Sequence, residues 1–235
     1  MREKDMYPTD KPKFERPKKE PTMTIETLLQ NHLALTSCQD SIGSARDLLI
    51  DTYRAGGKLL LCGNGGSCAD CDHIAGELLK GFLSHRPLSE EDCMALADTL
   101  PDGEADPDLY LLAGQLQGGL PAISLPAQTA AVTAVSNDTD PALIFAQLVW
   151  ALGQAGDTLV CLSTSGNSRN VVLAAKAAKA KGMAVLAMTG EHDSKLSELA
   201  DVTVQVPATD TYRVQEYHLP VYHYLCAAME EAFFG

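Results

Sequence analysis

The sequence contains no apolar run long enough to cross a membrane, because its longest apolar stretches have the length of a strand. The first residues, MREKDMYPTDKPKFERPKKEPTM, are charged and rich in proline, and they include no apolar segment typical of a secretory signal. Positive charge is also scarce: 18 Lys and Arg stand against 31 Asp and Glu, a formal net charge of −13. We therefore expect a soluble cytoplasmic protein that binds neither membranes nor nucleic acid. A small anionic substrate remains compatible with this charge, since a helix N-terminus can hold phosphate on an acidic protein.

Closely spaced cysteines are absent apart from one stretch, CGNGGSCADCDHIAGELL. Seven cysteines spread over 235 residues do not fit a disulfide scaffold, which is typically shorter and denser in cysteine. Cys62, Cys68 and Cys71 lie in this stretch, but no second cysteine pair follows at the spacing of a zinc ribbon. We expect these three residues to be small packing residues.

Strand-like and helix-like segments alternate along most of the chain. Strands are expected at 58–62, 121–126, 157–162, 183–190 and 202–207. Helices are expected at 24–53, as one long helix or a broken pair, and at 68–82, 169–181, 195–200 and 212–234. Such alternation predicts a parallel sheet covered on both faces. The predicted fold class is therefore α/β, a three-layer sandwich with a five-stranded parallel sheet flanked by helices and a long N-terminal helix.

The length fits one α/β domain with a well-buried core. Residues 1–22, rich in Lys, Pro and Glu, are predicted to form a disordered or extended arm. We expect a single domain over 23–235. An acidic segment at about 88–119 breaks the rhythm of strands and helices, and we predict an insertion that packs on the rim of the domain.

Two turns rich in glycine and serine follow predicted strands. GNGGS (63–67) lies between a strand and a helix, where a phosphate site and a plain tight turn are both reasonable interpretations. STSGNS (163–168) carries the hydroxyls of Ser163, Thr164, Ser165 and Ser168 just before a helix. A helix cap needs only one such residue, so this loop favours anion binding.

Histidine and acidic side chains share a face on the helix that follows GNGGS. His73 and Glu77 are four residues apart, which suits either a solvated surface pair or a site beside a bound sugar phosphate. Near the other end, YRVQEYHLPVYH places Gln215, His218 and His223 in the last helix. The pattern alone does not rank His218 against His223.

Six pieces resemble the sugar isomerase (SIS) domain family, and within it the bacterial isomerases of heptose phosphates. They are CGNGGS, DHIAGEL, AVSND, GDTLVCLSTSGNS, AAKAKGMAVLAMTG and RVQEYHLPVYHYLC, in the family's order from about 24 to 233. The arm and the insertion fall outside the resemblance. It implies an SIS-type fold, a zinc cofactor, and a homotetramer whose active sites lie at subunit interfaces.

The resemblance also implies a role for each matching residue. It places a first substrate loop at Asn64, Gly65, Gly66 and Ser67, and a second substrate-contacting pair at Asn137 and Asp138. The phosphate loop corresponds to Ser163, Thr164, Ser165 and Ser168. The zinc site corresponds to His73, Glu77, Gln215 and His223, in which Glu77 and Gln215 also touch the substrate.

The implied activity is an aldose–ketose isomerisation of sedoheptulose 7-phosphate to D-glycero-D-manno-heptose 7-phosphate, the first step of nucleotide-activated heptose synthesis. Glu77 suits the base, and His223 suits its acid/base partner. One alternative is a non-catalytic family member that binds a replication-initiation protein, although such a relative lacks the catalytic Glu and the last-helix His. The other is an isomerase or sensor for a different sugar phosphate.

Overall fold

The computed structural model describes residues 23–101 and 106–235, so the predicted arm at 1–22 lies outside the described residues. The N-terminal part contains α1 (Ile25–Asn31), the 3-10 helix η2 (Leu33–Cys38), α2 (Gln39–Arg54), β1 (Leu59–Gly63) and α3 (Gly66–Leu79). The middle contains α4 (Glu90–Thr99), α5 (Pro107–Gln115), β2 (Ala122–Ser124), α6 (Thr129–Asp138), η4 (Pro141–Leu143) and α7 (Ile144–Leu152). The C-terminal part contains β3 (Thr158–Leu162), α8 (Arg169–Ala180), β4 (Ala184–Thr189), β5 (Val202–Gln205) and α9 (Thr211–Phe234).

A five-stranded parallel sheet forms the middle layer and confirms the predicted fold class. The strand order is β2-β1-β3-β4-β5, and every neighbouring pair is parallel. All residues of β1 and β3 are buried, as expected for central strands covered on both faces. No helix in the described part of the chain is long and apolar enough to cross a membrane.

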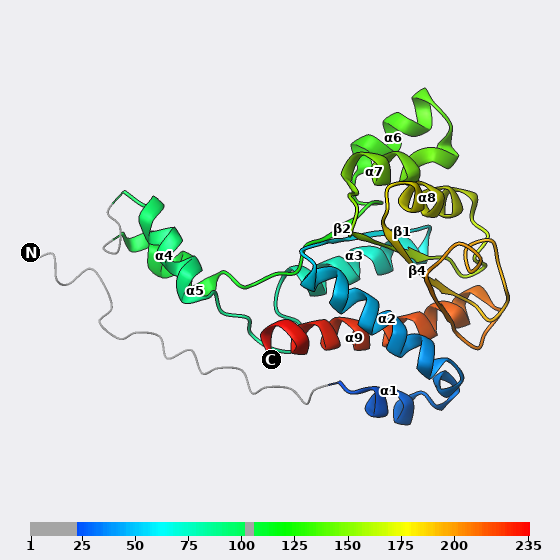
Figure 1. Ribbon diagram of the computed structural model, residues 1–235, viewed down its shortest axis with the longest axis horizontal. Coiled ribbons are helices and arrows are strands. Elements are labelled where there is room, and N and C mark those ends of the chain that lie inside the picture. Colours follow the sequence, from blue (N-terminus) through cyan, green and yellow to red (C-terminus); the bar gives the residue numbers. More distant parts are fainter. Residues whose placement is uncertain (1–22, 102–105) are drawn as a thin grey trace, which may run out of the picture.

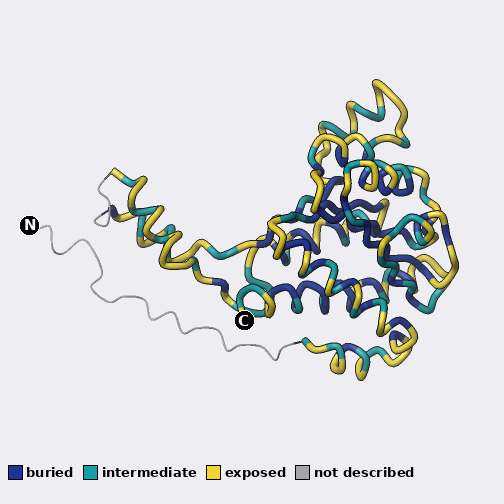
Figure 2. Tube along the Cα trace, in the orientation of Figure 1, coloured by how far each residue is buried: buried dark blue, intermediate teal, exposed yellow. Residues whose placement is uncertain are grey.

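Alternate residues of the strands feed two separate apolar cores. Leu59 and Leu61 of β1 pack into the layer formed with α2, α3 and α9. Leu60 and Cys62 pack into the layer formed with α7 and α8. This alternation follows from the two-residue period of a strand. Figures 1 and 2 show the buried sheet with one helical layer on each side.

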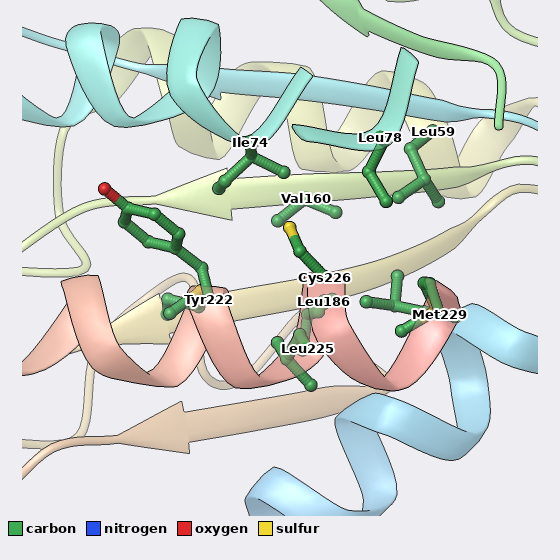
Figure 3. A pocket seen from close by; sticks show the side chains of 11 residues that line it. Leu59, Ile74, Leu78, Val160, Leu186, Tyr222, Leu225, Cys226 and Met229 are labelled. Atoms are coloured by element: carbon green, nitrogen blue, oxygen red, sulfur yellow. The ribbon is translucent and has the colours of Figure 1, made fainter. Parts of the chain in front are cut away.

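A small void lies inside the first of these cores, between the sheet, α3 and α9 (Figure 3). Its walls are apolar and include Ile74, Leu78, Val160, Cys226 and Met229. A sugar phosphate would lose its hydration there and gain no hydrogen-bond partners in return. The void is therefore a packing defect of the core and not a substrate site.

The N-terminal helical region is the broken pair, not one long helix. α1 ends at its C-cap His32, whose φ of −135° and ψ of 68° are not helical. The 3-10 segment η2 follows, and α2 begins only at Gln39. The break lets Leu28, Leu35 and Ile42 all reach the same core. Residues 195–200 form turns rather than the predicted short helix.

The insertion also differs from its prediction, because it does not lie on the rim of the domain. α4 and α5 pack on each other and project away from the sheet (Figure 1). Neither helix has a buried residue, and large apolar side chains such as Met94 and Tyr110 are exposed. The two ends of the insertion pair with each other in a short antiparallel bridge between Pro87 and Gln117, and the Gln117 side chain accepts from the Gly81 N–H at 3.2 Å.

A buried ion pair joins the end of α3 to α9. The Arg86 guanidinium is fully buried and donates to Glu230 Oε1 at 2.8 Å, to the Leu78 carbonyl at 2.8 Å and to the Glu77 carbonyl at 3.1 Å. The Glu230 carboxylate also accepts from three backbone N–H groups, those of Phe82, Leu83 and Ser84. Burial raises the pKa of Glu230, but these N–H groups and Arg86 outweigh it and hold that pKa below its usual value. Arg86 therefore satisfies two carbonyls at the end of α3 that have no partner within the helix.

Replacing Arg86 by Met should lower the free energy of unfolding by about 3–5 kcal/mol, because it leaves a buried carboxylate without its cation. Urea denaturation of the purified protein measures this change. Lys179→Met is the matched control, since it removes an ion pair with Asp201 whose side chains are 43% and 40% exposed, and such a pair is worth at most about 1 kcal/mol. Equal losses in the two variants would contradict the role given to Arg86.

Candidate functional site

The two glycine- and serine-rich turns lie side by side at the carboxyl ends of β1 and β3, which are neighbouring strands. Asn64 and Asn170 tie them together, because their side-chain amides exchange two hydrogen bonds of 2.9 and 2.8 Å. Gly65 has a φ of +57°, a conformation that favours glycine, and α3 begins directly after it. The carboxyl edge of a parallel sheet is where ligands of such folds bind.

The STSGNS loop brings its hydroxyls to the start of α8. Ser163, buried at the end of β3, donates to the Ser168 hydroxyl at 3.2 Å, and the Asn167 N–H donates to the Ser165 hydroxyl at 3.2 Å. Gly166 turns the loop with a φ of +62°. The predicted arrangement of hydroxyls before a helix N-terminus is thus present, and it suits an anionic group.

His73, Glu77 and His223 come together between α3 and α9. His73 Nε2 lies 3.1 Å from Glu77 Oε1. The rings of His73 and His223 meet edge to face with centroids 5.0 Å apart. The side chains of His73 and Glu77 are 43% and 19% exposed, so the cluster opens to solvent. The fold therefore brings together two residues of α3 and one residue of α9 that lies some 150 positions after His73.

The His223 ring contains a buried polar atom that is unsatisfied within the described residues. Its Nε2 is buried and has no hydrogen-bond partner among the described residues. Burial lowers the pKa of His223, and a positive charge on His73 lowers it further against the opposing effect of Glu77. The ring is therefore neutral at pH 7 and keeps a lone pair available to a proton or a metal ion.

The donor set of the cluster suits a metal ion in chemical type. Two imidazoles and a carboxylate are ligands that zinc prefers, and the unpaired His223 Nε2 lacks any other partner in the described residues. As these side chains now lie, no group of three or more His, Cys, Asp or Glu within the described chain is arranged to hold a metal. Instead, His73 Nε2 is occupied by its contact with Glu77. A metal ion would replace that contact.

The pair Tyr222 and Asp70 also belongs to the site, and sequence reasoning missed it. The Tyr222 hydroxyl lies 3.0 Å from His73 Nδ1 and donates to Asp70 Oδ1 at 3.2 Å. Burial raises the pKa of Asp70, and the hydrogen bond from Tyr222 and the charge of His73 oppose this only in part. Asp70 precedes His73 by three residues on α3, a spacing that does signal a shared face.

Three predicted site residues, Gln215, Asn137 and Asp138, form no hydrogen bond with this cluster within the described residues. The Gln215 amide lies against Gly66, where an added Cβ would come within 2.5 Å of its nitrogen. Gly66 precedes His73 by seven residues, about two turns of helix. Asn137 and Asp138 end α6, which packs on the α7–α8 side of the sheet, opposite α3 and α9 (Figure 1). Their roles remain predictions.

Two of the three cysteines expected to be packing residues, Cys62 and Cys71, lie in the apolar cores, whereas Cys68 is only half-buried. All seven cysteines are free thiols, and Cys62 and Cys71 are completely buried. Cys62 lies beside Cys161 on the neighbouring strand, with the two sulfur atoms 3.7 Å apart. Burial raises the pKa of the Cys71 and Cys161 thiols well above the usual value. Such thiols are inert packing groups.

The fold and the site define a parallel α/β protein with a histidine–carboxylate cluster on α3 and α9 and a hydroxyl-rich loop before α8. Residues 25–108 and 112–190 match the model of the SIS domain, and the chain belongs to the SIS domain family. The phosphoheptose isomerase of Rhodospirillum rubrum is 36% identical over 207 residues, which cover 88% of this chain and 94% of that protein. That of Mycobacterium tuberculosis is 36% identical over 214 residues, covering 91% and 92%.

Two solved structures agree with this assignment. The phosphoheptose isomerase of Neisseria gonorrhoeae superposes with a TM-score of 0.65 at 30% identity, covering 88% of this chain and 100% of that one. The phosphoheptose isomerase of Francisella tularensis gives a TM-score of 0.69 at 28% identity, covering 88% and 94%.

His218 has a structural role distinct from that of His223. Its ring is fully buried beneath β4 and lies 3.4 Å from the Thr189 carbonyl. Burial lowers the pKa of His218 to about 4, against a small opposing effect of that carbonyl. The folded chain therefore keeps this ring neutral at a pH where the unfolded chain protonates it. Stability is lost as the pH falls from about 6.5 to about 4.

Between about pH 6.5 and about pH 4, the wild type should lose on the order of 3 kcal/mol more unfolding free energy than the His218→Gln variant, because the variant has no buried imidazole to protonate. Urea denaturation at a series of pH values measures it. The matched control is His192→Gln, since His192 is exposed and should leave the dependence unchanged. A dependence that is the same in both variants would contradict the assignment.

Proposed function

We propose that this protein is an aldose–ketose isomerase that converts sedoheptulose 7-phosphate to D-glycero-D-manno-heptose 7-phosphate. Relatives that cover nearly the whole chain are phosphoheptose isomerases. The observation that carries the proposal is the contact of His73, Glu77 and His223 in a solvent-open site. The non-catalytic alternative is not favoured, because the carboxylate and the last-helix histidine it lacks are both present here.

The reaction moves a proton between two carbons of an open-chain sugar. Glu77, a partly exposed carboxylate, removes the proton from C1 of the ketose and returns it to C2. The neutral His223 ring moves a proton between the two oxygens, from the C1 hydroxyl to the C2 oxygen. The bond order shifts from C2=O through an enediol to C1=O, so atoms and charge balance. His73 lies against both groups and orients them.

We further propose a bound zinc ion at this site, held by His73, Glu77 and His223, with Gln215 as a fourth ligand by resemblance. When bound, zinc would stabilise negative charge that develops on the sugar oxygens. Support comes from the donor types and from the buried, unpaired His223 Nε2. Mixed nitrogen and oxygen ligation of this kind is weaker than that of a structural zinc site, so we expect partial occupancy.

The two loops are proposed to bind the rest of the substrate. Ser163, Thr164, Ser165 and Ser168 would hold the phosphate at the start of α8, and the first substrate loop, Asn64 to Ser67, would contact the sugar. α3 connects the first substrate loop to the cluster, because it begins at Gly66 and carries His73 and Glu77 further along the same helix. Hydroxyl and backbone donors compensate for the negative net charge near an anionic ligand.

We also propose a homotetramer. Asn137 and Asp138 lie on the far side of the sheet from the cluster, so within the chain they are badly placed to touch its substrate. A neighbouring copy could supply them to a shared site. The partly exposed His73 and the strongly exposed Leu33 and Trp150 are consistent with surfaces that other copies cover.

Replacing Glu77 by Gln or His223 by Asn should each lower turnover of sedoheptulose 7-phosphate by about 10²–10⁴-fold, because each removes a proton-transfer group. A coupled assay for the aldose product measures it. Asp72→Asn on the same helix is the control, since Asp72 is exposed and should keep near-normal turnover. Near-normal turnover in Glu77→Gln would contradict the mechanism. Tight binding of the heptose phosphate by wild type without product would identify a sensor instead.

The purified protein should bind zinc, and the His223→Asn variant should bind it more weakly. We expect that variant to bind at least about tenfold more weakly, because one imidazole ligand is gone. Competition with a chromogenic chelator measures the affinity. His192→Asn is the control for the loss of an exposed imidazole. Equal affinity in wild type and His223→Asn would remove His223 from the metal site.

A further inference from the structure

A chain of hydrogen bonds runs from Asp70 through Tyr222 to His73. Tyr222 comes from α9, whereas Asp70 and His73 come from one face of α3. The Tyr222 ring is buried at the edge of the apolar void, and its hydroxyl points away from that void (Figure 3). It reaches Asp70 Oδ1 at 3.2 Å and His73 Nδ1 at 3.0 Å. The opposite nitrogen of the same ring, Nε2, faces Glu77 at 3.1 Å.

The number of available protons limits how this chain can be arranged. A tyrosine hydroxyl has one proton, and an aspartate is ordinarily ionised at neutral pH and then only accepts. The Tyr222 hydroxyl therefore gives its proton to Asp70, as its geometry indicates. Its oxygen remains free to accept from His73, so a neutral His73 ring must carry its one proton on Nδ1, and a positively charged ring adds a second proton on Nε2. The reverse arrangement needs a protonated Asp70 and places the His73 proton on Nε2.

We propose that Tyr222 and Asp70 are positioning residues, which keep a proton on His73 Nδ1 and so turn the lone pair of Nε2 toward Glu77. This deepens the proposed function, because it prepares His73 to bind a cation beside Glu77 and fixes its ring against α9. A metal-binding histidine is typically oriented in this manner through its other nitrogen. The lone pair of a neutral Nε2 would repel the Glu77 carboxylate, and a cation between them removes that conflict.

The first test locates the proton directly and needs neither zinc nor turnover. Long-range ¹H–¹⁵N correlation spectra of the ¹⁵N-histidine-labelled, metal-free protein report which ring nitrogen is protonated, and His73→Asn assigns the signal. We expect a proton on Nδ1 of His73 in wild type. In Asp70→Ala, Tyr222 loses its acceptor and turns its proton to His73, so Nδ1 should become unprotonated. An unprotonated Nδ1 in wild type, or no change in Asp70→Ala, overturns the proposal.

The second test measures zinc affinity by chelator competition. Tyr222→Phe should weaken zinc binding by about 10- to 100-fold, the usual effect of losing such a partner. Tyr224→Phe is the matched control, because it removes a hydroxyl two residues along α9 whose partner is Arg46. Its affinity should stay within about threefold of wild type. Unchanged affinity in Tyr222→Phe overturns the positioning role.

These readouts separate this inference from the proposed function. If wild type binds zinc and Tyr222→Phe binds it weakly, but no isomerase activity is found, the function fails and the positioning role stands. If wild type isomerises the heptose phosphate but carries its His73 proton on Nε2, the function stands and the positioning role fails. Circular dichroism confirms folding of each variant, and Asp70→Ala serves where Tyr222→Phe does not fold, since alanine is a strong helix former.

Discussion

The contact between α3 and α9 is the constraint on which the site depends. α3 supplies His73 and Glu77, α9 supplies His223, and apolar side chains of both helices share one core above the sheet. The Arg86–Glu230 pair fastens the end of α3 to α9 and satisfies the carbonyls that α3 leaves open. Since both charges are buried, neither can turn to water if the helices shift, so the pair penalises any displacement of one helix against the other.

Within α3 and α9, residues of the candidate site lie only a few positions from residues that stabilise the core. In α9, His218 is buried and neutral beneath β4, whereas His223 lies at the edge of the site with an unpaired nitrogen. In α3, Cys71 and Ile74 face the core while His73 and Glu77 face outward. A helix of 3.6 residues per turn allows this division, because residues one or two positions apart point in very different directions.

Sequence reasoning predicted the parallel sheet, the two loops and the helical pair of His73 and Glu77, because each depends on a pattern of residues close together in the chain. Sequence reasoning placed no helix at α6 or α7, and it did not predict that α4 and α5 project from the domain. Those helices carry exposed apolar residues such as Tyr110, and composition alone does not say whether the domain covers them. The break at His32 likewise depends on how the apolar residues around it reach the core.

By itself, the sequence determined the fold class, because alternating strands and helices have few compact solutions, and it determined the family through motifs in a fixed order. Only the tertiary structure decided that His223 meets His73, that Tyr222 and Asp70 reach the same imidazole, and that Gln215 lies against Gly66. The physical reason is that contacts between residues about 150 positions apart are set by how two helices pack, and pattern along the chain does not encode that geometry.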